Sequence, residues 1–127
     1  MGLYADHILP WATNLACGGR PIARQRAKIV PEARGVVLEI GIGSGLNLPF
    51  YDSDKVKKVW GLEPVAGMRR MAQKIARDID IPVAFLDSPG EEIPLDNESV
   101  DTVLVTYTLC TIPDVESALK QMRRVLK

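Results

Sequence analysis

The stretch VVLEIGIGSG, residues 36–45, places an almost continuous apolar run directly before three glycines at alternate positions. An apolar run of this length, bounded by Gly35 and Gly41, is typical of a central parallel strand that is buried on both faces. Closely spaced glycines favour a loop in which the backbone bends sharply or approaches a ligand. Residues 36–40 are therefore predicted to form a strand that ends in a binding loop.

The rest of the chain alternates further strand-like and helix-like patterns. Strands are predicted over 58–62, 82–86 and 102–107, and helices over 21–30, 64–78 and 115–127. Asp114 is the expected N-cap of the last helix, and the first helix is expected to bury Ile22, Ile29 and Val30. Strands that alternate with helices predict an α/β fold, a Rossmann-like open parallel sheet flanked by helices. In such a sheet, ligands bind beyond the carboxyl ends of the strands.

Composition excludes several classes of function. Lysine plus arginine and aspartate plus glutamate both number 16 in 127 residues, so no net charge attracts nucleic acid. No apolar stretch approaches the roughly 20 residues of a membrane span. Cys17 and Cys110 are too few for a disulfide scaffold, which predicts a cytoplasmic protein; both thiols are expected to be buried. His7 is the single histidine, and no metal site is predicted.

Three ligands compete for the glycine loop: a dinucleotide, a phosphate, or a nucleoside without phosphates. A dinucleotide fingerprint needs a third glycine where this chain has Leu46. A phosphate-binding P-loop needs a lysine, and none lies between Gly41 and Lys55. Glu39 precedes the first glycine and would repel a diphosphate but favour a cationic ligand. These residues favour the nucleoside.

The pattern Glu39-x-Gly41-x-Gly43-x-Gly45 resembles the first motif of the class I S-adenosylmethionine-dependent methyltransferases. Glu63, in WGLEP and 24 residues after Glu39, matches the acid that accepts hydrogen bonds from both ribose hydroxyls in that family. The segment DSPGEEIPLDNESVD, residues 87–101, resembles the third motif, and residues 100–127 resemble the fourth strand and its helix. The resemblance spans residues 36–127.

The resemblance implies a set of residues that bind S-adenosyl-L-methionine. They are Glu39, Gly41, Gly43, Gly45, Asn47, Glu63, Pro64, Ser88, Pro89, Gly90 and Thr106. Pro89 stands where the family has an aspartate on the adenine amino group, so Asp87 or Ser88 is expected to substitute. Two alternatives stay open, in which Gly45 is only a turn glycine and Asn47 is the N-cap of the next helix. No general base is identified, so the catalytic residues stay unknown.

The two ends of the chain add expectations about organisation. Residues 1–35 resemble the helical cover segment of the small-molecule and lipid-headgroup branch, in which Tyr4 would close over the cofactor, or else merely pack on a neighbouring helix. Residues 36–127 form the α/β core. The family's sheet continues beyond the point where this sequence ends, so a truncated sheet of strand order 3-2-1-4 is expected. Its open fourth-strand edge would join two copies into a homodimer, by pairing or by exchange of elements.

The expected function is methyl transfer from S-adenosylmethionine to a small-molecule acceptor. The alternative is a noncatalytic S-adenosylmethionine-binding or dimerisation module that derives from a methyltransferase. A nicotinamide-dependent oxidoreductase is a more distant third interpretation. Titration with each cofactor distinguishes the three.

Overall fold

The computed structural model describes residue 8 and residues 19–127. Tyr4, His7 and Cys17, together with most of the predicted cover segment, lie outside the described residues. The described helices and strands follow one another in this order: α2 (Arg20–Ile29), β1 (Gly35–Ile40), β2 (Val56–Leu62), α3 (Ala66–Ala76), β3 (Val83–Leu86), β4 (Thr102–Val105) and α4 (Val115–Val125). Short 3-10 turns lie at Val30–Glu32, Leu48–Phe50 and Leu109–Thr111. No helix in this part of the chain is long and apolar enough to cross a membrane.

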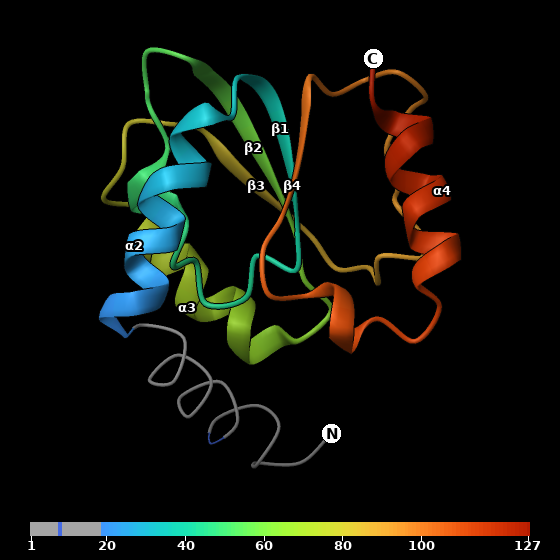
Figure 1. Cartoon of the computed structure of the whole chain (residues 1–127), viewed down its shortest axis with the longest axis horizontal. Coiled ribbons are helices and arrows are strands. Elements are labelled where there is room, and N and C mark those ends of the chain that lie inside the picture. The colour runs from blue at the N-terminus through green and yellow to red at the C-terminus, as the bar shows by residue number, and fades with distance from the viewer. Residues whose placement is uncertain (1–7, 9–18) are drawn as a thin grey trace.

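The four strands form one parallel sheet in the order β3-β2-β1-β4, as predicted. In its register Glu39 lies opposite Gly61 of β2 and Leu104 of β4. Figure 1 shows α2 and α3 on one side of the sheet and α4 on the other. The predicted Rossmann-like α/β fold is confirmed.

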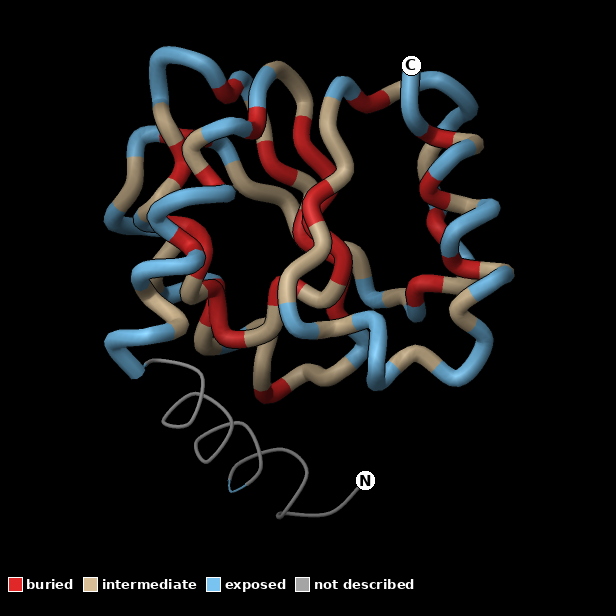
Figure 2. The backbone as a smooth tube through the Cα atoms, viewed as in Figure 1, coloured by how far each residue is buried: buried red, intermediate tan, exposed pale blue. Residues whose placement is uncertain are grey.

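The side chains of β1 alternate between two apolar cores. Val37 belongs to the core on the side of α2 and α3, whereas Leu38 and Ile40 belong to the core that α4 covers. Figure 2 shows the buried residues concentrated along the central strands and on the sides of the helices that face them. A central parallel strand is apolar on both faces because helices cover both. This explains why β1 gave the clearest signal in the sequence.

Several local predictions need correction. The strand predicted over 102–107 ends at Val105, because the backbone of Tyr107 takes a positive φ of 54° that a strand cannot contain. Ile29 is 51% exposed, whereas Arg26 of the same helix is buried. The thiol expected to be buried at Cys110 is exposed. Asp114 is confirmed as the N-cap of α4, since it accepts a hydrogen bond from the amide of Ser117 at 3.1 Å.

Gly45 fixes how closely the glycine loop approaches α3. Its φ is +86°, and a Cβ atom there would lie 2.9 Å from the Cα atom of Ala72. A backbone atom cannot move aside at low cost, so only glycine fits. Gly43 also has a positive φ, of +59°, but its Cβ would meet nothing nearer than Met68 Cε at 3.4 Å. Gly45 therefore packs against α3, whereas a Cβ at Gly43 would make only ordinary contact with the flexible end of Met68.

This difference predicts unequal costs for two alanine substitutions. Gly43→Ala should lower the free energy of unfolding by about 1 to 2 kcal/mol, the cost of left-handed backbone in an L-residue. Gly45→Ala should cost a further ~1 to 3 kcal/mol, because the new methyl group overpacks the contact with α3. Urea unfolding of the two variants measures both losses. Equal losses would contradict the close packing of Gly45 on the helix.

Candidate functional site

The glycine loop follows β1 at the carboxyl edge of the sheet and is tied to the two neighbouring strands. The amide of Ile42 donates to the carbonyl oxygen of Leu62 at the end of β2, at 3.1 Å. On the β4 side, a Cβ at Gly41 would lie 2.4 Å from Thr108, so the loop after β4 packs directly on this glycine. The loop therefore sits at the place where open α/β sheets bind ligands.

Glu63 follows β2 directly and turns its carboxylate toward the glycine loop. Oε1 accepts a hydrogen bond from the amide of Gly43 at 3.2 Å, and Oε2 accepts one from the amide of Val65 at 3.0 Å. Burial raises the pKa of this carboxyl above its ordinary value, and the two amides and the nearby charge of Arg69 offset part of the rise. Each oxygen of a carboxylate has a second acceptor site. Glu63 can therefore accept two more hydrogen bonds from a pair of neighbouring hydroxyls.

Glu39 lies inside the protein, below the loop. Its Oε1 accepts from the hydroxyl of Tyr51 at 2.7 Å, and its Oε2 accepts from the side-chain amide of Asn47 at 3.1 Å. Glu39 as a whole is 1% exposed, and burial raises the pKa of its carboxyl from 4.5 to about 7, with Tyr51, Asn47 and Arg26 each offsetting part of the rise. Burial, together with the neighbouring Glu39 carboxylate, raises the pKa of the Tyr51 hydroxyl. Glu39 is thus positioned to fix the loop.

Asn47 joins this carboxylate to two other elements. Its side-chain nitrogen also donates to Thr106 Oγ1 at 2.8 Å, and its side-chain oxygen accepts from Nη1 of Arg26 in α2. Asn47 occupies the N-cap position of the 3-10 turn Leu48–Phe50, as the alternative interpretation expected, but its side chain makes no capping hydrogen bond there. We call Glu39, Asn47, Tyr51, Thr106 and Arg26 the buried polar network. It connects β1, the glycine loop, the end of β4 and α2.

The residues predicted to meet the adenine follow β3, at the far end of the sheet edge. Ser88 is half-buried and Pro89 is exposed, whereas Gly90 packs against Ile112 and Ala118. Asp87, the other expected substitute for the missing aspartate, forms an ion pair with Arg69 at 3.0 Å. Of Asp87 and Ser88, Asp87 is thus already held in an ion pair, which favours Ser88 as the substitute for the aspartate.

Arg69 connects the loop after β3, predicted to meet the adenine, to Glu63, predicted to meet the ribose. Its Nη1 donates to the carbonyl oxygen of Glu63 at 2.6 Å as well as to Asp87. Pro64 is exposed and directly follows Glu63. Arg69 therefore holds together the segments that follow β2 and β3.

The structure brings the predicted residues to one edge of the sheet in two groups. Glu39, Asn47 and Thr106 are joined by side-chain hydrogen bonds, and Gly43 links this group to Glu63. Ser88, Pro89 and Gly90 lie beyond Glu63, after the next strand. Within the described residues, no group of three metal-ligating side chains is present.

The sequence interpretation missed Arg26, Tyr51 and Arg69. Arg26 had a usable signal, because it is four residues after Ile22 and four before Val30, on the stripe expected to be buried. Tyr51 and Arg69 had none, because their contacts join parts of the chain that only the fold brings together.

The geometry of this edge fits S-adenosylmethionine by two tests. A Cβ at Gly43 would meet nothing nearer than the flexible end of Met68, at ordinary contact distance, and the backbone there is held by Glu63, so this glycine is where a ligand can approach the loop. Glu39 and Glu63 are both buried at this edge, and in their ionised form these acids favour a ligand that carries an ammonium and a sulfonium.

The raised pKa of Glu39 predicts a pH-dependent stability. The carboxyl ionises near pH 4.5 in the unfolded chain and near pH 7 in the folded chain. Between these values the folded state holds more protons, so the free energy of unfolding falls as the pH rises. The fall is about 3 kcal/mol, because each pH unit between the two pKa values is worth about 1.4 kcal/mol. Glu39→Gln does not titrate and should lack this contribution.

Urea unfolding of the wild type and Glu39→Gln, from about pH 4.5 to about pH 8, measures the difference. The wild type should lose stability relative to the variant across this range, with Glu63 acting equally in both proteins. A difference that stays constant with pH would show that Glu39 is ionised throughout.

Comparison with known proteins shows the family to which the chain is similar. Residues 38–127 match the family model described as Methyltransferase domain. The chain is 30% identical over 122 residues to a phosphatidylethanolamine N-methyltransferase of Cereibacter sphaeroides, covering 82% of this chain and 51% of that protein. It is 35% identical over 88 residues to a methyltransferase of Anoxybacillus flavithermus named as uncharacterized, covering 69% and 39%. The chain therefore spans about half or less of the length of these relatives.

A solved structure shows the same fold. The crystal structure of a SAM-dependent methyltransferase from Aquifex aeolicus superposes with a TM-score of 0.69 at 24% identity, covering 83% of this chain and 58% of that one. S-adenosylmethionine is the cofactor that the family match indicates. The family model covers residues 38–127, from within β1 to Lys127, which is more than half of the chain. The chain therefore belongs to the methyltransferase domain family.

Proposed function

We propose that this chain binds S-adenosylmethionine as part of a methyltransferase that acts on a small-molecule acceptor. The observation that carries the proposal is the carboxylate of Glu63, held by the amides of Gly43 and Val65 with acceptor sites left for two hydroxyls. The name of the Cereibacter sphaeroides relative, an N-methyltransferase of a lipid headgroup, supports an acceptor that is not a macromolecule.

Each predicted residue then has a physical task. Glu63 holds the ribose, Ser88 to Gly90 form the adenine side, and the backbone at Gly41 and Gly43 meets the amino acid part. Bound S-adenosylmethionine supplies an activated methyl group on its sulfonium. Transfer of that group is an in-line displacement, for which alignment of the acceptor is the main requirement. A general base is therefore not needed for the proposal.

The ribose assignment is tested by Glu63→Ala. Loss of hydrogen bonds to a charged acceptor costs ~1.5 to 3 kcal/mol, so affinity for S-adenosylmethionine should fall by about tenfold to a hundredfold. Asp54→Ala is the matched control, because this exposed acid precedes β2 at the opposite edge of the sheet. Isothermal titration calorimetry measures both affinities. Tight binding that Glu63→Ala leaves unchanged would contradict the assignment.

The same titration separates the proposed enzyme from its alternatives. S-adenosylmethionine and S-adenosylhomocysteine should bind, whereas NAD should not. Transfer of a labelled methyl group to any acceptor supports the enzyme. Binding without transfer across a panel of small-molecule acceptors supports the noncatalytic module, and binding of NAD alone would support the oxidoreductase.

Assembly and location are also proposed. The outer edge of β4 has no paired strand in the described part of the sheet, and such an edge favours pairing with another chain. We propose a homodimer in which two copies pair along the β4 edge or exchange secondary-structure elements. We also propose that the protein is cytoplasmic. Sedimentation at micromolar concentration should show a dimer, and a monomer would contradict this proposal.

A further inference from the structure

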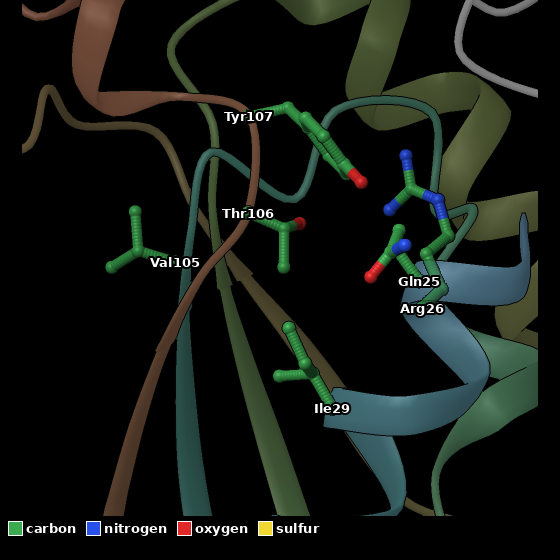
Figure 3. A pocket seen from close by; sticks show the side chains of 6 residues that line it. All are labelled: Gln25, Arg26, Ile29, Val105, Thr106 and Tyr107. Carbon is green, nitrogen blue, oxygen red and sulfur yellow. The ribbon is translucent and has the colours of Figure 1, made fainter. Parts of the chain in front are cut away.

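A pocket of about 230 Å³ opens between α2 and the end of β4. Gln25, Arg26 and Ile29 line it from α2, and residues 105–107 line it from the other side. Figure 3 shows Ile29, Thr106 and Tyr107 turned into the pocket, with the Val105 side chain turned away, so that β4 contributes mainly its backbone at that point.

The pocket lies beside the predicted cofactor site but beyond it. β4 is next to β1 on the side away from β2 and β3, which carry the predicted ribose and adenine positions. Thr106 belongs to both places, because its hydroxyl accepts from Asn47 while its side chain faces the pocket. A molecule in the pocket would therefore lie next to the amino acid end of the cofactor.

Arg26 gives the pocket a fixed positive charge. Its side chain is buried, its Nε has no hydrogen-bond partner in the described structure, and none of the described carboxylates forms an ion pair with it. Its Nη1 is engaged by the neutral side-chain oxygen of Asn47, and its guanidinium lies 5.3 Å from the ring centre of Tyr107. A guanidinium does not lose its proton in a protein. The charge of Arg26 lowers the pKa of Glu39, to which Asn47 links it, but Glu39 is also bonded to Tyr51 and makes no direct ion pair with the guanidinium. A buried cation whose Nε has no partner is costly, and a bound anion that reaches it would relieve part of that cost.

The mouth of the pocket is apolar. Ile29 is 51% exposed and Tyr107 is 52% exposed, although both carry large apolar groups. The backbone of Tyr107 also has a positive φ of 54°, a strained conformation for an aromatic residue. The pocket thus combines a cation inside with apolar surface at the opening, which fits an anion attached to a short apolar group.

We propose that this pocket binds the carboxylate or phosphate group of the methyl acceptor, with Arg26 as the anion-binding residue and Ile29 and Tyr107 against the acceptor's apolar part. This inference rests on the proposed function, because it names the chemical class of the acceptor. S-adenosylmethionine also carries a carboxylate, and Arg26 would attract that anion by the same chemistry. Binding experiments distinguish the anion of the acceptor from the anion of the cofactor.

The test changes the charge of the pocket without touching the buried polar network. Gln25 is exposed at the rim, so Gln25→Glu adds a negative charge there and Gln25→Lys adds a positive one. Ala27→Glu is the matched control, because it adds the same negative charge to α2 at an exposed position outside the pocket. The probes are hexanoate, hexyl phosphate and hexylamine, titrated into the chain with and without S-adenosylhomocysteine and followed by NMR chemical shifts.

Hexanoate or hexyl phosphate should bind in a saturable way and shift the signals of Arg26 and Tyr107, whereas hexylamine should not bind. Gln25→Glu should weaken the binding of the anion by about threefold to tenfold, as expected for one like charge near a partly exposed site. Gln25→Lys should maintain or strengthen it, and Ala27→Glu should leave it within about twofold of the wild type. Whichever of the two anions binds more tightly identifies the acceptor's anionic group.

Absence of anion binding, equal binding of hexylamine, or equal effects of Gln25→Glu and Ala27→Glu would each overturn the proposal. A second comparison tests whether the pocket instead holds the carboxylate of the cofactor. It measures the affinities of each variant for S-adenosylhomocysteine and for 5′-methylthioadenosine, which lacks that carboxylate. If Gln25→Glu weakens only S-adenosylhomocysteine, the pocket holds the cofactor's carboxylate and the proposal is wrong. Failure of the wild-type chain to bind S-adenosylhomocysteine would instead overturn the proposed function, so the two failures are distinguishable.

Discussion

A carboxyl group buried in the middle of the sheet has to be matched with hydrogen-bond donors, and in this protein Glu39 imposes that constraint. A buried carboxylate without partners is among the most costly groups in a fold. Tyr51 and Asn47 supply the donors, and Asn47 is in turn bound by Arg26 and bonded to Thr106. One buried acid thereby determines how the glycine loop, the end of β4 and α2 meet.

The predicted cofactor site depends on this arrangement through the shape of the loop. Because Asn47 anchors the end of the loop and Gly45 lets it lie against α3, the amide of Gly43 is directed at Glu63. The acid after β2 is thus oriented by backbone amides, one of them from the neighbouring loop. Orientation by a rigid backbone fixes the acceptor atoms before any ligand arrives, which reduces the cost of binding.

Much of the fold could be predicted from the sequence because its signals are local. The apolar run over residues 36–40, the glycines that follow and the N-cap at Asp114 each act within a few residues. The buried polar network could not be predicted, because Arg26 and Thr106 meet only after α2 and β4 pack on the same loop. Burial of Arg26 in place of Ile29 is a tertiary effect, in which the hydrogen bond to Asn47 outweighs hydrophobicity. The same effect creates the charged pocket beside β4.

The central claim is that the edge of the sheet formed by the glycine loop and Glu63 binds S-adenosylmethionine. A crystal structure of the chain with S-adenosylhomocysteine tests it most directly. We predict both ribose hydroxyls within hydrogen-bond distance of the Glu63 carboxylate, about 2.5 to 3.0 Å, with the ligand passing over Gly43. A ligand bound elsewhere, or bound with its ribose turned away from Glu63, would contradict the account.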